Sequence, residues 1–256
     1  MTPPRRASAA SRRRGWLGLR FVLLGCLGLS LAACVPTPSG TDATAPTAPP
    51  LPTTTPFAPA TTVPTPKVLL AEARGWAFRV RSTSCLATGS SFELGDGIVT
   101  NRHVASGSAT VQLSTWDGSD FSARVDAISG GPDLAVLSGS APPGTTGASL
   151  APDRPKPGTA VWAAGYPEGD QLSVLPGRVV GYIKGASIGS YGQVMEITNR
   201  VKPGNSGSAL LDREGVVVGV VFARDLRNGY GLAVPVKELR GFLAAPGDRR
   251  TGECAQ

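Results

Sequence analysis

Short runs of alternating apolar and polar residues begin near residue 77 of the chain. Six such runs are separated by glycine, proline, asparagine or aspartate at spacings of about 8 to 12 residues. A period of two residues is typical of a strand with one face in a core and the other in water. The pattern therefore predicts six strands, at residues 77–82, 89–94, 97–100, 109–114, 121–129 and 134–138.

A second set of six runs follows a stretch rich in proline and glycine at residues 141–158. It predicts strands at residues 160–165, 171–183, 193–198, 207–212, 215–223 and 231–234. Two sets of about six short strands around a linker are typical of two small barrels or sandwiches. Only residues 236–243, where charged and apolar side chains interleave, predict a helix. No internal repeat with a fixed period of about 20 to 50 residues interrupts this arrangement.

The start of the chain has a different pattern. Five arginines precede a mostly apolar run at residues 16–33, which contains a sixth, Arg20, and leads into Leu31-Ala32-Ala33-Cys34. A positively charged start, an apolar segment and small residues before a cleavage point predict a signal peptide at residues 1–33. The last four residues resemble the lipobox of bacterial lipoproteins, in which Cys34 would carry a diacylglyceryl group. A plain signal peptide and an uncleaved signal anchor stay open, since about 18 apolar residues lie at the lower limit for a membrane span.

Residues 34–66 are almost wholly proline, threonine and alanine and have no hydrophobic period. This composition predicts a disordered tether. At ~3.1 Å per residue in an extended polyproline conformation, it would reach roughly 100 Å. We therefore place the folded domain at residues 68–256, with one barrel at about 70–140, a second at about 155–235 and the helix after it.

The formal net charge of +7 suggests nucleic-acid binding at first sight. Six of the 25 lysines and arginines, however, precede Cys34, where no acidic residue occurs, which leaves 19 basic against 18 acidic residues beyond that point. A nearly neutral domain has no overall field that attracts phosphates, so nucleic acid is not an expected partner. The basic charge belongs to the export signal.

Four cysteines occur in the chain. Cys26 would leave with the signal peptide and Cys34 would carry lipid, which leaves Cys85 and Cys254. In an exported protein, two remaining thiols predict one disulfide, which would close a loop of 169 residues between positions 85 and 254. The alternative is a pair of unpaired buried thiols.

His103 is the only histidine in the chain, which excludes multi-histidine metal sites. We expect no metal and no cofactor. His103 follows a predicted strand in the run Thr100-Asn101-Arg102-His103-Val104. A general base must be held rigidly and yet face a cleft, and the end of a strand provides such a place. A lone histidine without further motifs would usually be an ordinary surface or core residue.

Thirty residues later, Asp133 comes directly before an apolar run. A carboxylate there can be partly buried and can orient an imidazole ring. Asp126 is the weaker candidate, because it lies inside a strand with ordinary alternation and is expected to be a solvated surface charge.

The run from Pro203 to Ala209 reads Pro-Gly-Asn-Ser-Gly-Ser-Ala. Its glycines allow a tight turn in which the backbone N–H groups of Gly204 and Ser206 converge on one point, as an oxyanion hole requires. Ser206 is then the candidate nucleophile. Taken alone, such a turn could equally be a hairpin loop.

The order His, Asp, Ser in a β-rich chain of this size resembles the chymotrypsin-like serine proteases. The Thr-Asn-x-His-Val, Asp-Leu-Ala-Val-Leu, Gly-Tyr-Pro-x-Gly and Gly-Asn-Ser-Gly motifs are similar to the HtrA-type branch, and to membrane-tethered periplasmic proteases of the MarP kind. The resemblance implies an all-β double barrel, each barrel with six strands, an active site between them and endopeptidase activity. It assigns His103 as base, Asp133 as its orienting acid, Ser206 as nucleophile, and Gly204 with Ser206 as oxyanion donors.

The same resemblance suggests substrate-binding residues. Phe222-Ala223-Arg224 is similar to the segment that pairs with substrate backbone, and Gly231 is similar to a pocket-lining glycine. Arg200, six residues before Ser206, would favour acidic P1 residues if it pointed into the S1 pocket; the alternative is a solvated loop charge.

Three departures from the family pattern change the expectations. Asn205 replaces an aspartate that pairs with a newly cleaved N-terminus in digestive relatives, so activation by that route is not expected. Arg102 stands where alanine is common and Ser208 where glycine is common. No PDZ domain is expected after the final helix.

The resulting hypothesis is an exported, lipid-anchored serine endopeptidase of the cell envelope, with peptide or protein substrates and a membrane contact through lipid on Cys34. One alternative is a catalytically weak protease-like module that binds peptides or envelope components, and another is a structural envelope lipoprotein. The sequence leaves the natural substrate, the P1 preference and the oligomeric state open.

Overall fold

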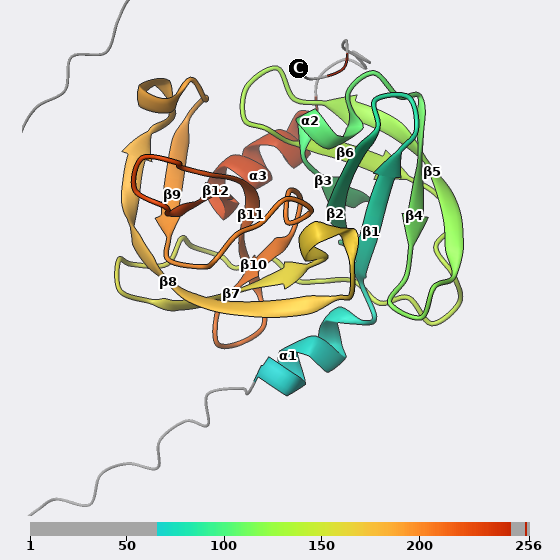
Figure 1. Ribbon diagram of the computed structural model, residues 1–256, viewed down its shortest axis with the longest axis horizontal. Helices are drawn as coiled ribbons and strands as arrows, with labels where there is room; N and C mark the ends of the chain where they lie inside the picture. The colour runs from blue at the N-terminus through green and yellow to red at the C-terminus, as the bar shows by residue number, and fades with distance from the viewer. Residues whose placement is uncertain (1–65, 247–253, 255–256) are drawn as a thin grey trace, which may run out of the picture. The chain divides into compact units, whose positions relative to one another are not determined.

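The computed structural model describes residues 66–246 and Cys254 (Figure 1). The predicted signal peptide, Cys34 and the tether up to residue 65 lie outside the described residues, so these predictions stay predictions. Within the described residues, the fold consists of two closed antiparallel barrels of six strands each, which confirms the expected all-β architecture.

The first barrel contains six strands paired in the order β1-β2-β3-β6-β5-β4. They are β1 (Ala77–Ser82), β2 (Ala87–Glu93), β3 (Ile98–Thr100), β4 (Thr110–Ser114), β5 (Asp120–Ile128) and β6 (Ala135–Ser138). Alternate side chains, such as Phe78 and Val80 on β1, point into the barrel and are fully buried. Closing the sheet removes the two exposed edges that an open sheet of this size would have.

The second barrel repeats this plan in the order β10-β11-β12-β9-β8-β7. Its strands are β7 (Ala160–Gly165), β8 (Ser173–Lys184), β9 (Gln193–Ile197), β10 (Ala209–Leu211), β11 (Val217–Arg224) and β12 (Gly231–Pro235). Met195, Ile197 and Leu210 are among its fully buried side chains. Burying a side chain of this size contributes about 1.5–3 kcal/mol, so the filled interior is the main source of stability for each barrel.

A third apolar cluster lies outside the two barrel interiors and includes Trp76, Phe92, Tyr166 and Leu211. Its members come from both barrels. Two hydrogen bonds accompany this packing, from the Tyr166 hydroxyl to the Ala77 carbonyl oxygen at 3.1 Å and from the Arg79 guanidinium to the Gly169 carbonyl oxygen at 3.1 Å. The barrels are therefore joined by a packed and hydrogen-bonded interface.

Three α-helices accompany the barrels in the described residues, where the sequence predicted one. The expected C-terminal helix is α3 (Val236–Ala244). The expectation of a single helix was wrong, because α1 (Pro66–Ala73) and the four-residue α2 (Arg102–Ala105) are also present. Helix α1 buries Leu69 and Ala73, which are spaced by one turn, and it contacts β7 and β8 although it precedes the first barrel in the chain. Helix α1 begins at Pro66, the first described residue, and the expected domain boundaries stay predictions.

A disulfide joins Cys85 to Cys254, with a separation of 169 residues. It ties the turn between β1 and β2 to the end of the chain. None of the described helices is long and apolar enough to span a bilayer. Across residues 66–246 and Cys254, no cluster of three or more histidine, cysteine, aspartate or glutamate side chains has the arrangement of a metal site.

Candidate active site

His103 and Asp133 lie in direct contact at the end of the first barrel. The His103 Nδ1 atom is 2.6 Å from Asp133 Oδ2, and the His103 backbone N–H donates to Asp133 Oδ1 at 3.0 Å. The carboxylate is 12% exposed and the imidazole 35% exposed. Both carboxylate oxygens of Asp133 therefore bind His103. They fix the imidazole ring through Nδ1, while the ring remains partly exposed to solvent.

Two neighbours of His103 hold the loop that carries Asp133. The fully buried Asn101 amide donates to the Asp133 carbonyl oxygen at 2.7 Å. The Arg102 guanidinium donates to the carbonyl oxygens of Ser129 and Gly131, both at 3.1 Å. The residue that departs from the family pattern at position 102 thus fastens the segment before Asp133. Asp126 instead pairs with Arg124 on the same strand at 2.8 Å and takes no part in this arrangement.

The loop before β10 presents Ser206 and the two predicted oxyanion donors. Gly204 has φ of +88°, a left-handed conformation that favours glycine. The carbonyl oxygen of Pro203 accepts from the Glu168 N–H at 2.6 Å and that of Asn205 from the Ser208 N–H at 2.9 Å. In a trans peptide the N–H points opposite to the carbonyl. The N–H groups of Gly204 and Ser206 consequently point away from these contacts, and within the described residues neither donates to a protein acceptor.

Gly89 on β2 lies between the segments that carry His103 and Ser206. A Cβ added there would be 2.8 Å from the Ser206 carbonyl oxygen and 2.8 Å from the Cγ2 atom of Val104, the residue after His103. The Ser206 hydroxyl donates to the Phe222 carbonyl oxygen at 3.3 Å, and no hydrogen bond joins it to His103 in the described part of the chain. In unliganded sites such hydrogen bonds are often long or absent and form when substrate binds.

The predicted substrate strand lies beside the nucleophile. Phe222 is at a β-bulge, because the register of β11 against β12 shifts between Val221 and Ala223. A bulge leaves one residue outside the ladder, and here the carbonyl oxygen of that residue accepts from the Ser206 hydroxyl. Phe222, Ala223 and Arg224 also line a cavity of 300 Å³ together with Ile188 and Leu226. The strand therefore has one residue outside the ladder, and the hollow beside it is lined by both apolar and charged side chains.

Gly231 and Val201 face each other beside this strand. A Cβ added to Gly231 would be 2.7 Å from Val201 Cγ2, and Val201 is 5% exposed. Arg200 is exposed and forms no ion pair or side-chain hydrogen bond with the described residues. Val201, rather than Arg200, thus contacts the predicted pocket-lining glycine. Val201 is a pocket residue that the local sequence pattern did not identify.

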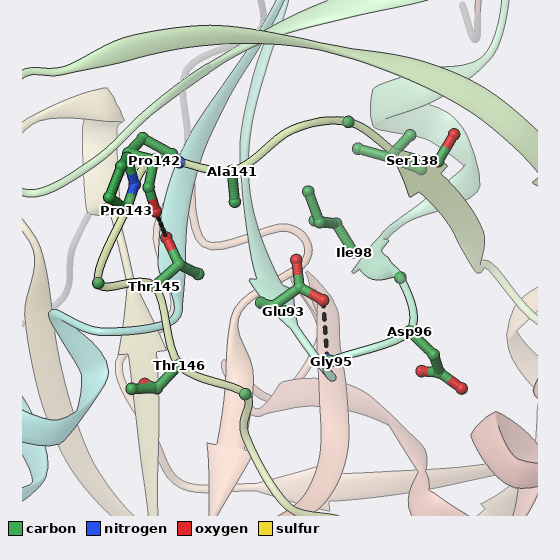
Figure 2. Close-up of a pocket in the computed structure, with 15 residues that line it drawn as sticks. Glu93, Gly95, Asp96, Ile98, Ser138, Ala141, Pro142, Pro143, Thr145 and Thr146 are labelled. Carbon is green, nitrogen blue, oxygen red and sulfur yellow. Dashed lines mark hydrogen bonds between the residues drawn. The ribbon is translucent and has the colours of Figure 1, made fainter.

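A cavity of 530 Å³ lies elsewhere, between the β2–β3 turn and residues 139–147. Figure 2 shows two of its polar groups turned to local backbone: the Glu93 carboxylate accepts from the Gly95 N–H at 2.8 Å, and the Thr145 hydroxyl donates to the Pro142 carbonyl oxygen at 2.8 Å. The remaining lining is mostly glycine, proline and small apolar residues. It contains no histidine or cysteine and no member of the candidate triad, so it offers no alternative catalytic centre.

Tyr166 and Asp225 are titratable groups near the site whose pKa values are shifted. Burial raises the pKa of the Tyr166 hydroxyl above its ordinary value, so this group remains a hydrogen-bond donor to Ala77. Side-chain and backbone hydrogen bonds from Arg227 lower the pKa of Asp225, which directly follows the substrate strand. Asp225 is thereby kept ionised.

Comparison with known proteins agrees with this geometry. Residues 87–220 match the family described as trypsin-like peptidase domain. The serine protease Do-like HtrA of Bacillus subtilis is 32% identical over 154 residues, which cover 56% of this chain and 34% of that protein. The serine protease Rv3671c of Mycobacterium tuberculosis is 30% identical over 172 residues, which cover 62% of this chain and 42% of that protein. The chain thus spans about two-fifths or less of the length of these curated relatives.

Solved structures show the same fold. The crystal structure of the Rv3671c protease from M. tuberculosis in its active form has a TM-score of 0.65 and 26% identity, and covers 80% of this chain and all of that one. The HtrA-type protease AlgW with a tripeptide has a TM-score of 0.64 at 23% identity and shows the fold alone, covering 72% of this chain and 65% of that one. Because the family match covers just over half of the chain, this protein belongs to the trypsin-like peptidase family.

Proposed function

We propose that the protein is a serine endopeptidase in which Ser206 is the nucleophile, His103 the general base and Asp133 the acid that orients it. The observation that carries this proposal is the His103–Asp133 pair, with an Nδ1–Oδ2 distance of 2.6 Å, close to a serine whose loop has two unengaged N–H groups. A nucleophile, a base, an orienting carboxylate and oxyanion donors are the parts that acyl transfer needs.

The reaction would proceed through an acyl-enzyme. Ser206 Oγ attacks the carbonyl carbon of the scissile bond, and its proton passes to Nε2 of His103. The electron pair displaced onto the carbonyl oxygen faces the N–H groups of Gly204 and Ser206, which stabilise the negative charge. Collapse of this intermediate expels the amine, which takes the proton from His103. A water molecule then repeats the sequence on the ester, releasing the carboxylic acid and restoring Ser206.

Substrate would bind as an extended strand along Phe222–Arg224 by backbone pairing. The contact between Val201 and Gly231 leaves limited depth where the P1 side chain would enter, so small aliphatic P1 residues are favoured. Arg200 is exposed, which favours the role of a solvated loop charge. It argues against the alternative, in which Arg200 points into the S1 pocket and selects acidic P1 residues.

The protein would act outside the cytoplasm, held to the membrane by lipid on Cys34. The signal-like residues 1–33 support export, and one relative, DegP of Escherichia coli, is named a periplasmic serine endoprotease. Mass spectrometry of the protein from membranes of its source cells tests the anchor: a diacylglyceryl mass on Cys34 supports it, and an unmodified N-terminus contradicts it.

A fluorophosphonate probe tests the activity. The wild-type protein is expected to be labelled covalently, and Ser206→Ala is expected to give no labelling because the attacking oxygen is gone. Equal labelling of both proteins, or none of either, would contradict the proposal. Peptide binding without labelling would favour the alternative of a binding module.

A further inference from the structure

Ser90 on β2 is a fully buried serine that reaches from the first barrel to the second. Its hydroxyl donates to the Gly204 carbonyl oxygen at 2.8 Å and accepts from the Tyr166 N–H at 2.9 Å. Its backbone N–H donates to the Ser206 carbonyl oxygen at 2.7 Å. One residue of the first barrel thus contacts the carbonyl groups of both residues whose N–H groups form the candidate oxyanion hole.

The four consecutive carbonyl groups from Pro203 to Ser206 are all engaged. The Glu168 and Ser208 N–H groups hold those of Pro203 and Asn205, and Ser90 holds the other two, those of Gly204 and Ser206. The hydrogen bond at each carbonyl therefore fixes the orientation of each peptide plane in this loop. The two N–H groups left without a protein acceptor among the described residues are those of Gly204 and Ser206.

Gly204 is the point at which this loop could change shape. Its φ of +88° and its lack of a side chain mean that the adjoining peptide planes can rotate at low steric cost. A rotated plane would replace an N–H donor by a carbonyl oxygen and would repel the negative charge of the intermediate. Without its hydrogen bond to Ser90, the Gly204 carbonyl would be a buried acceptor without a donor, which is energetically unfavourable.

The Ser90 hydroxyl also connects this carbonyl to the turn that holds the neighbouring plane. It accepts from Tyr166, and the same turn, η1 (Pro167–Gly169), provides the Glu168 N–H that binds Pro203. Tyr166 is in turn held by its hydroxyl bond to Ala77. The Ser90 hydroxyl therefore takes part in both contacts that orient Gly204. It binds the Gly204 carbonyl directly, and it holds the turn whose Glu168 N–H binds the Pro203 carbonyl.

We propose that Ser90 is a positioning residue of the peptidase, whose hydroxyl keeps the oxyanion loop in its donor-presenting shape. This inference rests on the proposed function, since an oxyanion hole has a role only if Ser206 is acylated. It predicts that removing the hydroxyl slows acylation of Ser206 while leaving ground-state peptide binding nearly unchanged, because the hydroxyl bonds to Gly204 and Tyr166 and not to the strand Phe222–Arg224.

Ser90→Ala tests the proposal, with Ser91→Ala as the matched control. Ser91 is the next residue on β2, is 1% exposed, and its hydroxyl donates at 3.5 Å to the Phe78 carbonyl oxygen within the first barrel. Both variants lose one buried hydroxyl, but only Ser90→Ala loses contact with the oxyanion loop.

For Ser90→Ala we expect kcat to fall about 10- to 100-fold with KM within about threefold of wild type, since losing one oxyanion donor outright lowers kcat about 100- to 1,000-fold. For Ser91→Ala we expect kcat within about threefold of wild type.

Fluorophosphonate labelling of the wild-type protein separates this inference from the proposed function. No labelling of the wild type overturns the function itself. If the wild type is labelled and kcat is unchanged in Ser90→Ala, the positioning role is overturned. An equal fall in kcat in both variants also overturns it, because that result would indicate a purely structural effect.

If Ser90→Ala does not fold, Ser90→Cys takes its place. The thiol fills the space but hydrogen-bonds weakly, so the same loss of kcat at constant KM is expected.

Discussion

Asp133 uses both carboxylate oxygens on His103, one on the ring and one on the backbone N–H. An uncharged amide at this position could fill the same space but would present one acceptor instead of two. The ring would then lose either its preferred tautomer or its orientation. In the proposed mechanism, the positive charge that forms on His103 would also lose its partner. The carboxylate therefore matters more for the reaction than for the fold.

Asp133→Asn is expected to lower kcat by about 10,000-fold, the effect of the same change in the Ser-His-Asp template. Steady-state hydrolysis of a peptide substrate measures it. Asp126→Asn is the matched control, because Asp126 pairs only with Arg124 and should leave kcat unchanged. Equal activity of Asp133→Asn and wild type would show that the pair has no catalytic role.

Val201 gives a second prediction, on specificity. Val201→Ala removes two methyl groups that face Gly231 and should deepen the pocket for the P1 side chain. The ratio of kcat/KM for P1 Leu over P1 Ala should rise about tenfold, as expected for added apolar contact in a pocket. A peptide library digested by both proteins measures the shift. Arg200→Gln should leave the P1 preference unchanged, and a loss of preference for acidic P1 residues in that variant would instead place Arg200 in the pocket.

The spacing of His103, Asp133 and Ser206 could be recognised in the sequence because each residue lies in a short motif. The role of Val201 could not, since nothing in the local pattern states which of residues 200 and 201 turns inward. That choice depends on the contact with Gly231, 30 residues later, and only the folded chain reveals it.

At the scale of elements, all twelve strands lie within about three residues of the positions predicted from alternation. Strands such as β1 and β5 keep a period of two because buried residues alternate with more exposed ones. Strands β7, β10 and β12 are buried on both faces, so short apolar runs between turn residues identify them instead. Helix α1 was missed for a physical reason. Its eight residues contain only Leu69 and Ala73 as buried positions, and Pro66 at its start continues the composition of the tether.

The segment after β11 depends on pH through Asp225. The Asp225 side chain is 6% exposed and bonds the Arg227 guanidinium at 2.7 Å, and these hydrogen bonds lower its pKa from the ordinary value of 3.8. A carboxyl group with a lowered folded-state pKa stabilises the fold fully above its unfolded pKa and loses that effect as the pH falls through the folded value. The ion pair should therefore stabilise the protein at neutral pH and not in strong acid.

Asp225→Asn tests this reasoning. Urea unfolding should show the variant to be less stable than wild type at about pH 7, with the difference shrinking toward zero at about pH 2. If the stability difference between Asp225→Asn and wild type grew on acidification, the lowered pKa of Asp225 would be contradicted.

At the scale of the whole molecule, the decisive contacts join positions far apart in the sequence. Ser90 and Gly204 are separated by 114 residues, and Tyr166 and Ala77 by 89. Local periodicity identifies strands but contains no information on which barrel face meets which loop. The sequence thus predicted two barrels and a candidate triad, while the hydrogen bonds that hold the candidate oxyanion loop against the first barrel emerged only from the structure.

The disulfide between Cys85 and Cys254 acts at this same scale. It lies against Gly107, where an added Cβ would be 2.5 Å from Cys85 Sγ, shortly after helix α2. A crosslink over 169 residues removes conformations mainly from the unfolded chain, and chain-entropy models for such a loop give about 5 kcal/mol. Measured values are often smaller, because unfolded chains retain some structure.

The double variant Cys85→Ser with Cys254→Ser is therefore expected to unfold at a temperature roughly 5 to 15 °C below wild type, since 1 kcal/mol shifts the midpoint by about 2 to 4 °C in a domain of this size. Thermal unfolding followed by circular dichroism measures the midpoint. Because both barrels have complete apolar interiors of their own, the variant should still fold at 25 °C and retain its β-sheet signal. An unchanged midpoint would mean that the segment ending at Cys254 is held equally well without the covalent bond.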